Sequence, residues 1–391
     1  MSEWKKVKLG DYIDVLSGFA FKSKDFSDSG IPVIKIKNVC PPYISLEDLS
    51  YVPNSIAFQN PRYILRKGDV LIAMTGSHIN QIASVVGRVG RVRYDAITVL
   101  NQRVGKIVNK NEAKSSLDYI YYYLSQYEVK VELAQKAGGA ANQANISPSD
   151  IKNLLFPYPP IEIQHRIATI LSRYDSLIEN YQKQIKLLEE AAQRLYKEWF
   201  VNLHFPGHEN TKIVNGVPEG WEKKKVGDIT PIKTGKKDAN FGTSDGAYPF
   251  FTCSQEPIKA PSYSFDTSAV ILAGNGDFNV KLYRGKFEAY QRTYVLEPTN
   301  EKMLYLLYFC ISENMNRLAT GASGSTIKFL TKGMIESLVI NKPSTIVLDS
   351  FNQIIEPIRT QKENLQSQIR LLTEARDRLL PKLMSGEIEV S

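Results

Sequence analysis

Polar side chains that could contact a nucleic acid collect in segments between predicted strands and helices. Asn and Gln can bond to base edges through paired hydrogen bonds, while Lys, Ser and Thr suit phosphate oxygens. Surface loops of any protein carry such residues, so an ordinary solvated loop is the alternative at every position. The candidate DNA-binding residues are Lys22, Lys35, Lys37, Asn38, Thr75, Ser77, His78, Asn80, Gln81, Asn142, Gln143, Asn145, Lys236, Lys237, Asn275, Asn279, Lys281, Ser323, Ser325, Thr326 and Lys328.

No arrangement of residues in the sequence predicts catalysis. There is no glycine turn of the dinucleotide-binding type and no phosphate loop ending in Lys-Ser or Lys-Thr. Asn60-Pro61-Arg62-Tyr63 is similar to an amino-methyltransferase motif, but Arg62 replaces its second proline. Pro206-Gly207 lies between His204 and His208 and prevents the helix that would make them a metal pair. We therefore predict a binding protein with no catalytic residue, metal or cofactor of its own.

The composition fits a large protein with an anionic partner. The 391 residues allow two or three domains, and the net charge of +8 favours an anionic partner, although basic proteins without a nucleic-acid partner are common. Three isolated cysteines indicate neither a disulfide framework nor a zinc cluster. The most apolar run, residues 305–311, is too short to span a membrane, and the N-terminus lacks a run of signal-peptide length. We expect a cytoplasmic protein without a membrane partner.

Two long helices are predicted by heptad periodicity. After Pro159-Pro160, apolar residues between 161 and 200 recur in alternating steps of three and four, the pattern of a coiled coil. The same pattern returns near the C-terminus. The predicted seam residues are Leu171, Tyr174, Ile178, Tyr181, Ile185, Leu188, Leu195 and Trp199, followed by Ile355, Ile358, Leu365, Ile369, Leu372, Leu379 and Leu383.

The two helices belong to an internal duplication. Glu179-Asn180 recurs as Glu363-Asn364, and Trp4 has a counterpart in Trp221. Each half is predicted to be a mixed globular domain followed by a helix, so the expected fold class is α+β with an internal repeat. The predicted boundaries are 1–158 for the first domain, 159–202 for the central helix, 203–220 for a linker, 221–343 for the second domain and 344–391 for the C-terminal helix.

Short apolar runs separated by Gly, Pro and Asn predict strands in the first domain. Residues 117–136 have helical periodicity, and residues 305–318 repeat this helix in the second domain. The predicted strands are residues 31–36, 70–74, 84–92 and 104–108.

The second helix departs from the first at three positions. Pro357 predicts a kink or a break, because proline removes a backbone hydrogen bond. Lys362 and Arg376 occupy seam positions that are Ile178 and Ala192 in the first helix. Their stems could line the seam while their charges reach water, or their charges could fix the helix register.

The two domains differ most in the candidate loops and agree at structural positions. Gly18 has a counterpart in Gly235, and Gln102-Arg103 is repeated as Gln291-Arg292. One scaffold carrying two different sets of loops suits a reader of two unlike DNA sequences.

Several loose motifs occur in an order that identifies a family. They are Leu16-Ser17-Gly18-Phe19-Ala20-Phe21-Lys22-Ser23, Gly68-Asp69-Val70-Leu71-Ile72, Pro159-Pro160 with Ile161-Glu162-Ile163-Gln164, and Val217-Pro218-Glu219-Gly220-Trp221. With them the chain resembles, along nearly its full length, the specificity subunit of a type I restriction-modification system. Residues 343–348 depart from the family pattern, since they lack the paired prolines before the second helix.

This resemblance implies two target recognition domains separated by two antiparallel coiled-coil helices. Each domain would read half of a bipartite, asymmetric site in double-stranded DNA, and the helices would set the spacer. The subunit would be non-catalytic and would recruit two methyltransferase subunits, which use S-adenosylmethionine, and two restriction subunits, which use ATP and Mg. The alternative is a coiled-coil protein-interaction scaffold without DNA binding.

Overall fold

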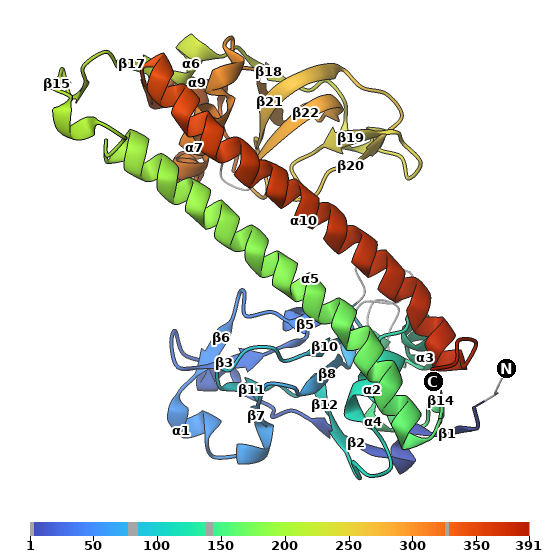
Figure 1. The fold of residues 1–391 in the computed structure, drawn as a ribbon. Helices are drawn as coiled ribbons and strands as arrows, with labels where there is room; N and C mark the ends of the chain where they lie inside the picture. Colours follow the sequence, from blue (N-terminus) through green and yellow to red (C-terminus); the bar gives the residue numbers. More distant parts are fainter. Residues whose placement is uncertain (1–3, 77–84, 138–143, 325–327, 391) are drawn as a thin grey trace. The chain divides into compact units, whose positions relative to one another are not determined.

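The computed structural model describes residues 4–76, 85–137, 144–324 and 328–390, and the chain forms two units (Figure 1). Unit 1 contains residues 1–180 and 368–391, and unit 2 contains residues 181–367. The long helices are α5 (Ile161–Tyr196), which continues into the π-helical turn η5 (Lys197–Val201), and α10 (Thr345–Ser385). Each long helix therefore contributes one segment to each unit.

The elements of unit 1 confirm the predicted mixed character of the first domain. Its strands are β1 (Lys6–Lys8), β2 (Ile13–Ser17), β3 (Ile31–Ile34), β4 (Val39–Cys40), β5 (Tyr43–Ile44), β6 (Ser50–Val52), β7 (Ile64–Leu65), β8 (Val70–Ala73), β9 (Thr75–Gly76), β10 (Val89–Arg91), β11 (Thr98–Leu100), β12 (Val104–Asn109), β13 (Ala144–Asn145) and β14 (Leu155–Pro157). Its shorter helices are α1 (Asn54–Ala57), α2 (Leu117–Leu124), α3 (Tyr127–Lys136), α4 (Pro148–Lys152), and the 3-10 turns η1 (Leu9–Asp11), η2 (Ser23–Asp25), η3 (Ile36–Asn38) and η4 (Pro61–Tyr63).

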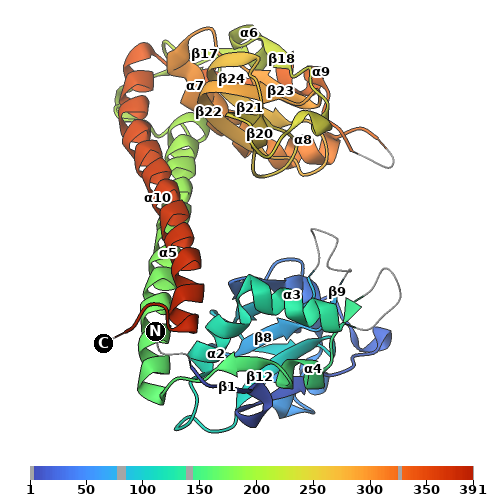
Figure 2. The ribbon, with the colours of Figure 1, turned by 90° about the vertical axis from the view of Figure 1, so that its right-hand side faces the viewer.

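Strand β8 is the centre of unit 1. It lies between β12 and β10 in a six-stranded sheet of order β2-β12-β8-β10-β5-β4 and is antiparallel to both neighbours. Val70 and Ile72 pack with helix α2, while Leu71 and Ala73 pack on the opposite face. Burial on both faces explains why this strand reads as a continuous apolar run and not as an alternating one. Figure 2 shows α2 and α3 lying across this sheet.

Unit 2 repeats this plan with longer central strands. Its strands are β15 (Ile213–Val214), β16 (Val217–Pro218), β17 (Glu222–Lys225), β18 (Ile232–Thr234), β19 (Tyr248–Phe251), β20 (Ile258–Ala260), β21 (Phe265–Ala273), β22 (Val280–Ala289), β23 (Thr293–Leu296) and β24 (Val339–Lys342). Its shorter helices are α6 (Val226–Ile229), α7 (Leu304–Glu313), α8 (Met315–Gly321), α9 (Lys332–Glu336), and the 3-10 turns η6 (His208–Asn210), η7 (Ala239–Phe241) and η8 (Glu301–Met303).

The two units match strand for strand around the centre. β21 lies between β23 and β22, as β8 lies between β12 and β10, in a six-stranded sheet of order β18-β23-β21-β22-β19-β20. The match extends to packing details: the guanidinium of Arg91 lies 4.4 Å from the ring centroid of Tyr121, and that of Arg284 lies 5.3 Å from that of Tyr305. The internal duplication is therefore a duplication of the fold.

The helix predicted over residues 117–136 is interrupted. It divides at Ser125–Gln126 into α2 and α3, and its repeat divides at Asn314 into α7 and α8. Ser125 Oγ donates to the carbonyl of Tyr121 at 2.7 Å, and Asn314 Nδ2 donates to that of Cys310 at 2.8 Å. These side chains cap carbonyl groups at the ends of α2 and α7, so the chain turns at equivalent places in the two units.

The predicted linker, residues 203–220, is an ordered part of unit 2. It contains η6 and the β15–β16 hairpin, in which Ile213 pairs with Pro218. Phe205 and Val217 are buried in the same core cluster as Trp221. Its Gly, Pro and Asn residues form turns, as expected, but the intervening apolar residues anchor the segment.

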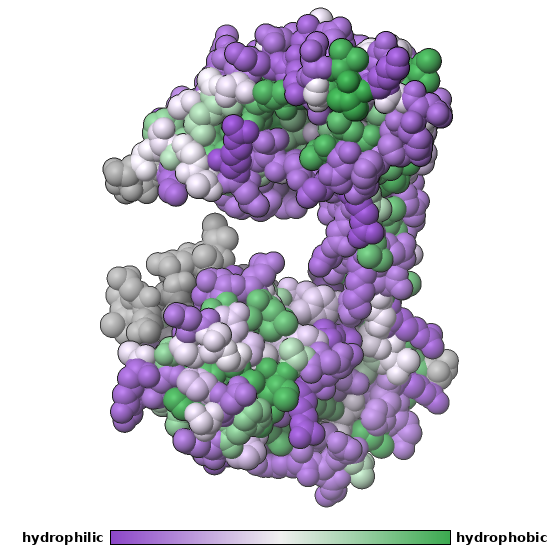
Figure 3. Space-filling view, turned by 90° about the vertical axis from the view of Figure 1, so that its left-hand side faces the viewer, coloured by the Kyte–Doolittle hydropathy of each residue, from purple (hydrophilic) through white to green (hydrophobic). Residues whose placement is uncertain are grey.

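The predicted seam faces inward on both long helices. Every predicted seam residue is buried or half-buried, whereas Leu187 and Leu371, which lie off the seam, are 64% and 55% exposed. The outward faces of the helices are mainly hydrophilic with separate hydrophobic side chains (Figure 3). Within each unit the helix segments run in opposite directions: in unit 2, Phe200 packs on Phe351 while Glu189, earlier in α5, pairs with the later Lys362.

Both charged seam residues form ion pairs across the helices. Lys362 Nζ lies 2.6 Å from Glu189 in unit 2, and Arg376 Nη1 lies 2.7 Å from Asp175 in unit 1. Asp175 is 1% exposed and also accepts a 2.7 Å hydrogen bond from Tyr122 Oη. Burial disfavours the charge of Arg376, but hydrogen bonds to Asp175 and Asp377 outweigh it and raise the pKa of Arg376. These pairs favour the register interpretation over charges that simply reach water.

Pro357 does not break the second helix, because α10 continues from Thr345 to Ser385, and a kink at this position stays a prediction. A proline inside a helix costs about 3 kcal/mol or more. Ile355 is 2% exposed and Phe351 is fully buried, so packing of the flanking turns opposes a break. The helix also begins at Thr345 without the paired prolines that precede α5.

Candidate nucleic-acid interface

The end of the central strand is where the predicted loops of unit 1 meet. The Met74 N–H donates to the carbonyl of Arg103 at 3.0 Å, and the Met74 carbonyl accepts from Ile146 N–H at 2.9 Å. One residue further, Thr75 Oγ1 donates to Asn145 Oδ1 at 2.8 Å, where β9 pairs with β13. The structure therefore brings together Thr75 and Asn145, which are 70 residues apart in the chain.

The same place in unit 2 has the same backbone connections. The Gly274 N–H donates to the carbonyl of Arg292 at 2.8 Å, and its own carbonyl accepts from Leu330 N–H at 2.8 Å. A side chain at Gly274 would collide with its neighbours, since a Cβ there would lie 2.4 Å from the Arg292 carbonyl oxygen. The next residue, Asn275, is one of the candidate DNA-binding residues and forms an antiparallel β-bridge with Phe329.

The loop between β21 and β22 is tied to the segment after β19. Asn275 Oδ1 accepts from Cys253 Sγ at 2.8 Å, and Asn279 Nδ2 donates to the Cys253 carbonyl at 3.1 Å. Lys281 Nζ donates to the carbonyl of Ser254 at 2.8 Å, and burial lowers the pKa of Lys281. These three predicted residues form one cluster, and their hydrogen bonds hold the loop in shape.

The other predicted residues of unit 2 lie around this cluster. Ser323 and Phe329 exchange backbone hydrogen bonds of 3.0 and 2.8 Å, and Lys328 is exposed beside them. Lys236 is exposed, while Lys237 Nζ lies over the ring of Phe241 at 4.4 Å.

The early residues predicted in unit 1 have mainly structural roles. Asn38 is 1% exposed, and its side chain bonds to the Lys35 N–H at 3.0 Å and to the Glu47 carbonyl at 3.0 Å. Lys35 Nζ donates to Ser50 Oγ at 2.8 Å, and burial lowers its pKa. Lys37 is ion-paired with Asp48. Asn38 therefore closes a turn in this structure, and its contact with DNA stays a prediction. Lys22 is exposed.

Eight predicted residues lie outside the residues that the structure describes. They are Ser77, His78, Asn80, Gln81, Asn142, Gln143, Ser325 and Thr326.

The candidate list omitted the turn that carries Arg103 in unit 1 and Arg292 in unit 2. This turn is built by the same backbone hydrogen bonds in both units. Gln102 N–H donates to the Phe19 carbonyl at 2.9 Å, and Gln291 N–H donates to that of Lys237 at 3.0 Å. The sequence shows this turn as a repeated Gln-Arg pair, but the sequence does not show that the turn lies beside the loops.

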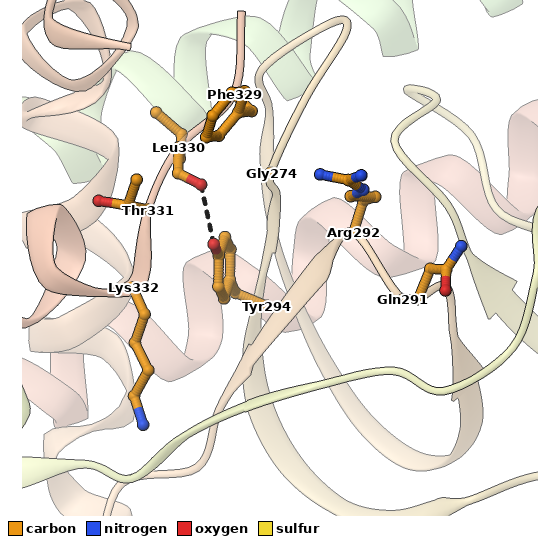
Figure 4. A pocket seen from close by; sticks show the side chains of 8 residues that line it. All are labelled: Gly274, Gln291, Arg292, Tyr294, Phe329, Leu330, Thr331 and Lys332. Carbon is orange, nitrogen blue, oxygen red and sulfur yellow. Dashed lines mark hydrogen bonds between the residues drawn. The ribbon is translucent and has the colours of Figure 1, made fainter. Parts of the chain in front are cut away.

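In unit 2 the arginine turn lines a hollow of about 460 Å³. Figure 4 shows Arg292 and Lys332 on opposite sides of Tyr294, whose hydroxyl donates to the Leu330 carbonyl at 2.8 Å. The guanidinium of Arg292 gives this hollow a group that can bind an anion.

Other classes of site find no support in the described parts of the chain. Among these residues no group of His, Cys, Asp and Glu side chains could hold a metal ion. No helix within the described ranges has the length and apolar character needed to cross a bilayer.

Comparisons with known proteins show which family the chain is similar to. A family profile described as Type I restriction modification DNA specificity domain matches residues 1–190 and 218–365. The chain is 27% identical to the Type I restriction enzyme MjaIX specificity subunit of Methanocaldococcus jannaschii, over 99% of this chain and 94% of that protein. It is 38% identical to the Type I restriction enzyme EcoDI specificity subunit of Escherichia coli, over 44% of this chain and 39% of that protein.

A solved structure has the same fold. The crystal structure of the type I restriction-modification system S subunit from M. genitalium aligns with a TM-score of 0.59 at 17% identity, covering 99% of this chain and 97% of that one. The profile matches well over half of the sequence, once in each half. The chain therefore belongs to the family of type I restriction-modification specificity subunits and carries two copies of the DNA specificity domain.

Proposed function

We propose that this chain is the sequence-reading subunit of a type I restriction-modification complex, with each unit recognising one half of a bipartite, asymmetric site in double-stranded DNA. The observation that carries the proposal is the repeated strand end. Met74 and Gly274 are held by equivalent backbone bonds. The loops that follow differ, with Thr75 bonded to Asn145 in unit 1 and Asn275 bonded to Cys253 in unit 2.

The chemistry of these loops supports reading of base edges. Asn and Gln side chains can bond to adenine through two hydrogen bonds, and Lys can bond to guanine. Loops that are held rigidly by a sheet present such groups with a defined spacing, which base discrimination requires. Two unlike sets of loops on one scaffold fit two unlike half-sites.

The proposal includes partner subunits that perform the chemistry. A specificity subunit is not itself the enzyme, so methylation and cleavage belong to two methyltransferase and two restriction subunits with S-adenosylmethionine, ATP and Mg. Leu187 in unit 2 and Leu371 in unit 1 occupy equivalent positions of the duplicated helix and are 64% and 55% exposed. Two equivalent exposed leucines suit two copies of one partner.

The test compares the purified chain alone with the complex reconstituted from the chain and its partner subunits. We expect the lone chain to bind duplex DNA but to transfer no methyl group from labelled S-adenosylmethionine, and the complex to methylate one bipartite motif. A pure chain that methylates DNA alone would overturn the division of labour. Partner binding without any DNA binding, in the presence or absence of partners, would favour the scaffold alternative.

A further inference from the structure

We propose that Arg103 and Arg292 are equivalent phosphate contacts, which grip the DNA backbone independently of sequence, one in each unit. This inference rests on the proposed function and adds residues to it. Each arginine follows a glutamine in a turn. In unit 1 this turn precedes β12, which pairs with the central strand β8, and in unit 2 it precedes β23, which pairs with the central strand β21.

The backbone of this turn is held in the same way in both units. Asn101 N–H donates to the Ile34 carbonyl at 3.1 Å, and Tyr290 N–H donates to that of Phe251 at 2.9 Å. The glycine that follows β2 in unit 1 and β18 in unit 2 lies close to this turn: a Cβ on Gly18 would lie 2.3 Å from the Asn101 oxygen, and one on Gly235 would lie 2.6 Å from the equivalent Tyr290 oxygen. The turn is thus fixed against the strand end from which the reading loops depart.

Within the described residues, neither guanidinium group has a hydrogen bond or an ion pair. Both Arg103 and Arg292 are exposed. Neighbouring polar groups are engaged: Gln291 Nε2 donates to Asp238 at 2.8 Å, and Lys332 lies 3.5 Å from Glu336. The arginine is therefore the cation available to an incoming anion.

The pattern of repetition separates phosphate contact from base reading. Domains that read different sequences must differ in their sets of base-reading side chains, whereas a phosphate contact carries no sequence information and can be the same in both. The loops after Met74 and Gly274 differ, but the Gln-Arg turn beside them is the same. A planar guanidinium also matches the two oxygens of a phosphodiester.

In unit 2, the hollow lined by Arg292 is the place where the proposed phosphate would bind. Arg292 and Lys332 line it from opposite sides of Tyr294, next to the loop that carries Asn275 (Figure 4). A phosphodiester bound here would lie beside the predicted base-reading cluster. Backbone contacts of this kind fix the register of a protein on the duplex.

The test measures how salt weakens binding of the full chain to a mixed-sequence DNA duplex. Each phosphate contact contributes about 0.9 to the slope of log affinity against log salt. We expect Arg103→Ala and Arg292→Ala each to make the slope about 0.9 less steep, and the double variant to make it about 1.8 less steep. Over a fourfold rise in salt, each single variant should therefore lose about 3.5-fold less affinity than the wild type. Arg→Lys at either position should restore the slope.

Arg66 supplies the matched control. It is an exposed turn arginine at the opposite end of β8, and Arg66→Ala should leave the slope unchanged. Wild-type slopes in both alanine variants would overturn this inference while leaving DNA recognition intact. Loss of discrimination between matched and mismatched duplexes, or loss of partner subunits with DNA binding unchanged, would assign the arginines to another role and also overturn it. A wild-type chain that binds no duplex, with or without its partner subunits, would instead refute the proposed function.

Discussion

Asp175 is a buried carboxylate that joins three parts of unit 1. It lies on α5 and binds Tyr122 of α2 and Arg376 of α10, each at 2.7 Å. Asp175→Ala would leave the Arg376 guanidinium, whose side chain is only 17% exposed, with Asp377 as its remaining ion-pair partner among the described residues. Breaking a buried pair in this way destabilises by about 3 kcal/mol. Chemical denaturation should show a lower unfolding midpoint for the variant.

Glu374→Ala is the control for this loss. Glu374 is 44% exposed and pairs with Arg378 one turn away on the same helix, so its removal should cost less than about 0.5 kcal/mol. Equal midpoints for the two variants would show that burial adds nothing to the Asp175 pair.

Lys328 tests the reading surface of unit 2. It is exposed beside Phe329, whose backbone pairs with Ser323 and Asn275. If Lys328 binds a base edge, Lys328→Ala should reduce discrimination at one base pair by about 1–3 kcal/mol. If it binds phosphate, affinity for all sequences should fall and the salt slope should decrease by about 0.9. Binding to matched and mismatched duplexes at several salt concentrations distinguishes these results, and no effect in either assay would place Lys328 off the DNA.

Residue roles were only partly predictable from the sequence. The seam residues follow from periodicity, because burial on a helix pair repeats every three or four residues. Asn38 could not be separated from a DNA-contacting asparagine, since its burial depends on the Glu47 carbonyl nine positions away. The arginine turn was visible as a repeat, but its closeness to the loops depends on strand order.

At the scale of elements, the central strands and both long helices were predicted, while the interruptions were not. Val70–Ala73 and Val104–Asn109 agree with the predicted strands. The breaks at Ser125 and Asn314 escaped prediction because neither residue is a strong helix breaker; their side chains cap carbonyls only once the chain turns. Pro357 does not break α10, since packing of the neighbouring turns opposes a break.

The paired helices predict that the spacer of the DNA site depends on helix length. One heptad inserted after Tyr181 in α5 and one after Gln368 in α10 would leave the pairs Asp175–Arg376 and Glu189–Lys362 intact. Seven residues lengthen a helix by about 10 Å, which corresponds to about three base pairs. Methylation mapping should show unchanged half-sequences with a longer spacer. The same heptad inserted in α5 alone would break the pairing of the helices and should abolish activity. An unchanged spacer in the double insertion would contradict the prediction that helix length sets the spacer.

In the whole molecule, the duplication organises the structure into two matching units. Trp221 marks the start of the second copy, as Trp4 marks the first, and it packs on Phe200 and Phe205 in the core of unit 2. The α+β class, the repeat and the family could be predicted because they depend on patterns that span the chain. The DNA bases cannot be read from the loops, because a side chain specifies a base only through its docked geometry.

The most direct test of the account exchanges one domain. Residues 221–343, from Trp221 before β17 to Pro343 before α10, would be replaced by the equivalent segment of a related specificity subunit. The chimaera would be expressed with its partner subunits, and the methylated motif would be mapped across the host genome. We predict that one half of the motif changes while the other half stays the same. A change in both halves, or in neither, would contradict the claim that each unit reads its own half-site.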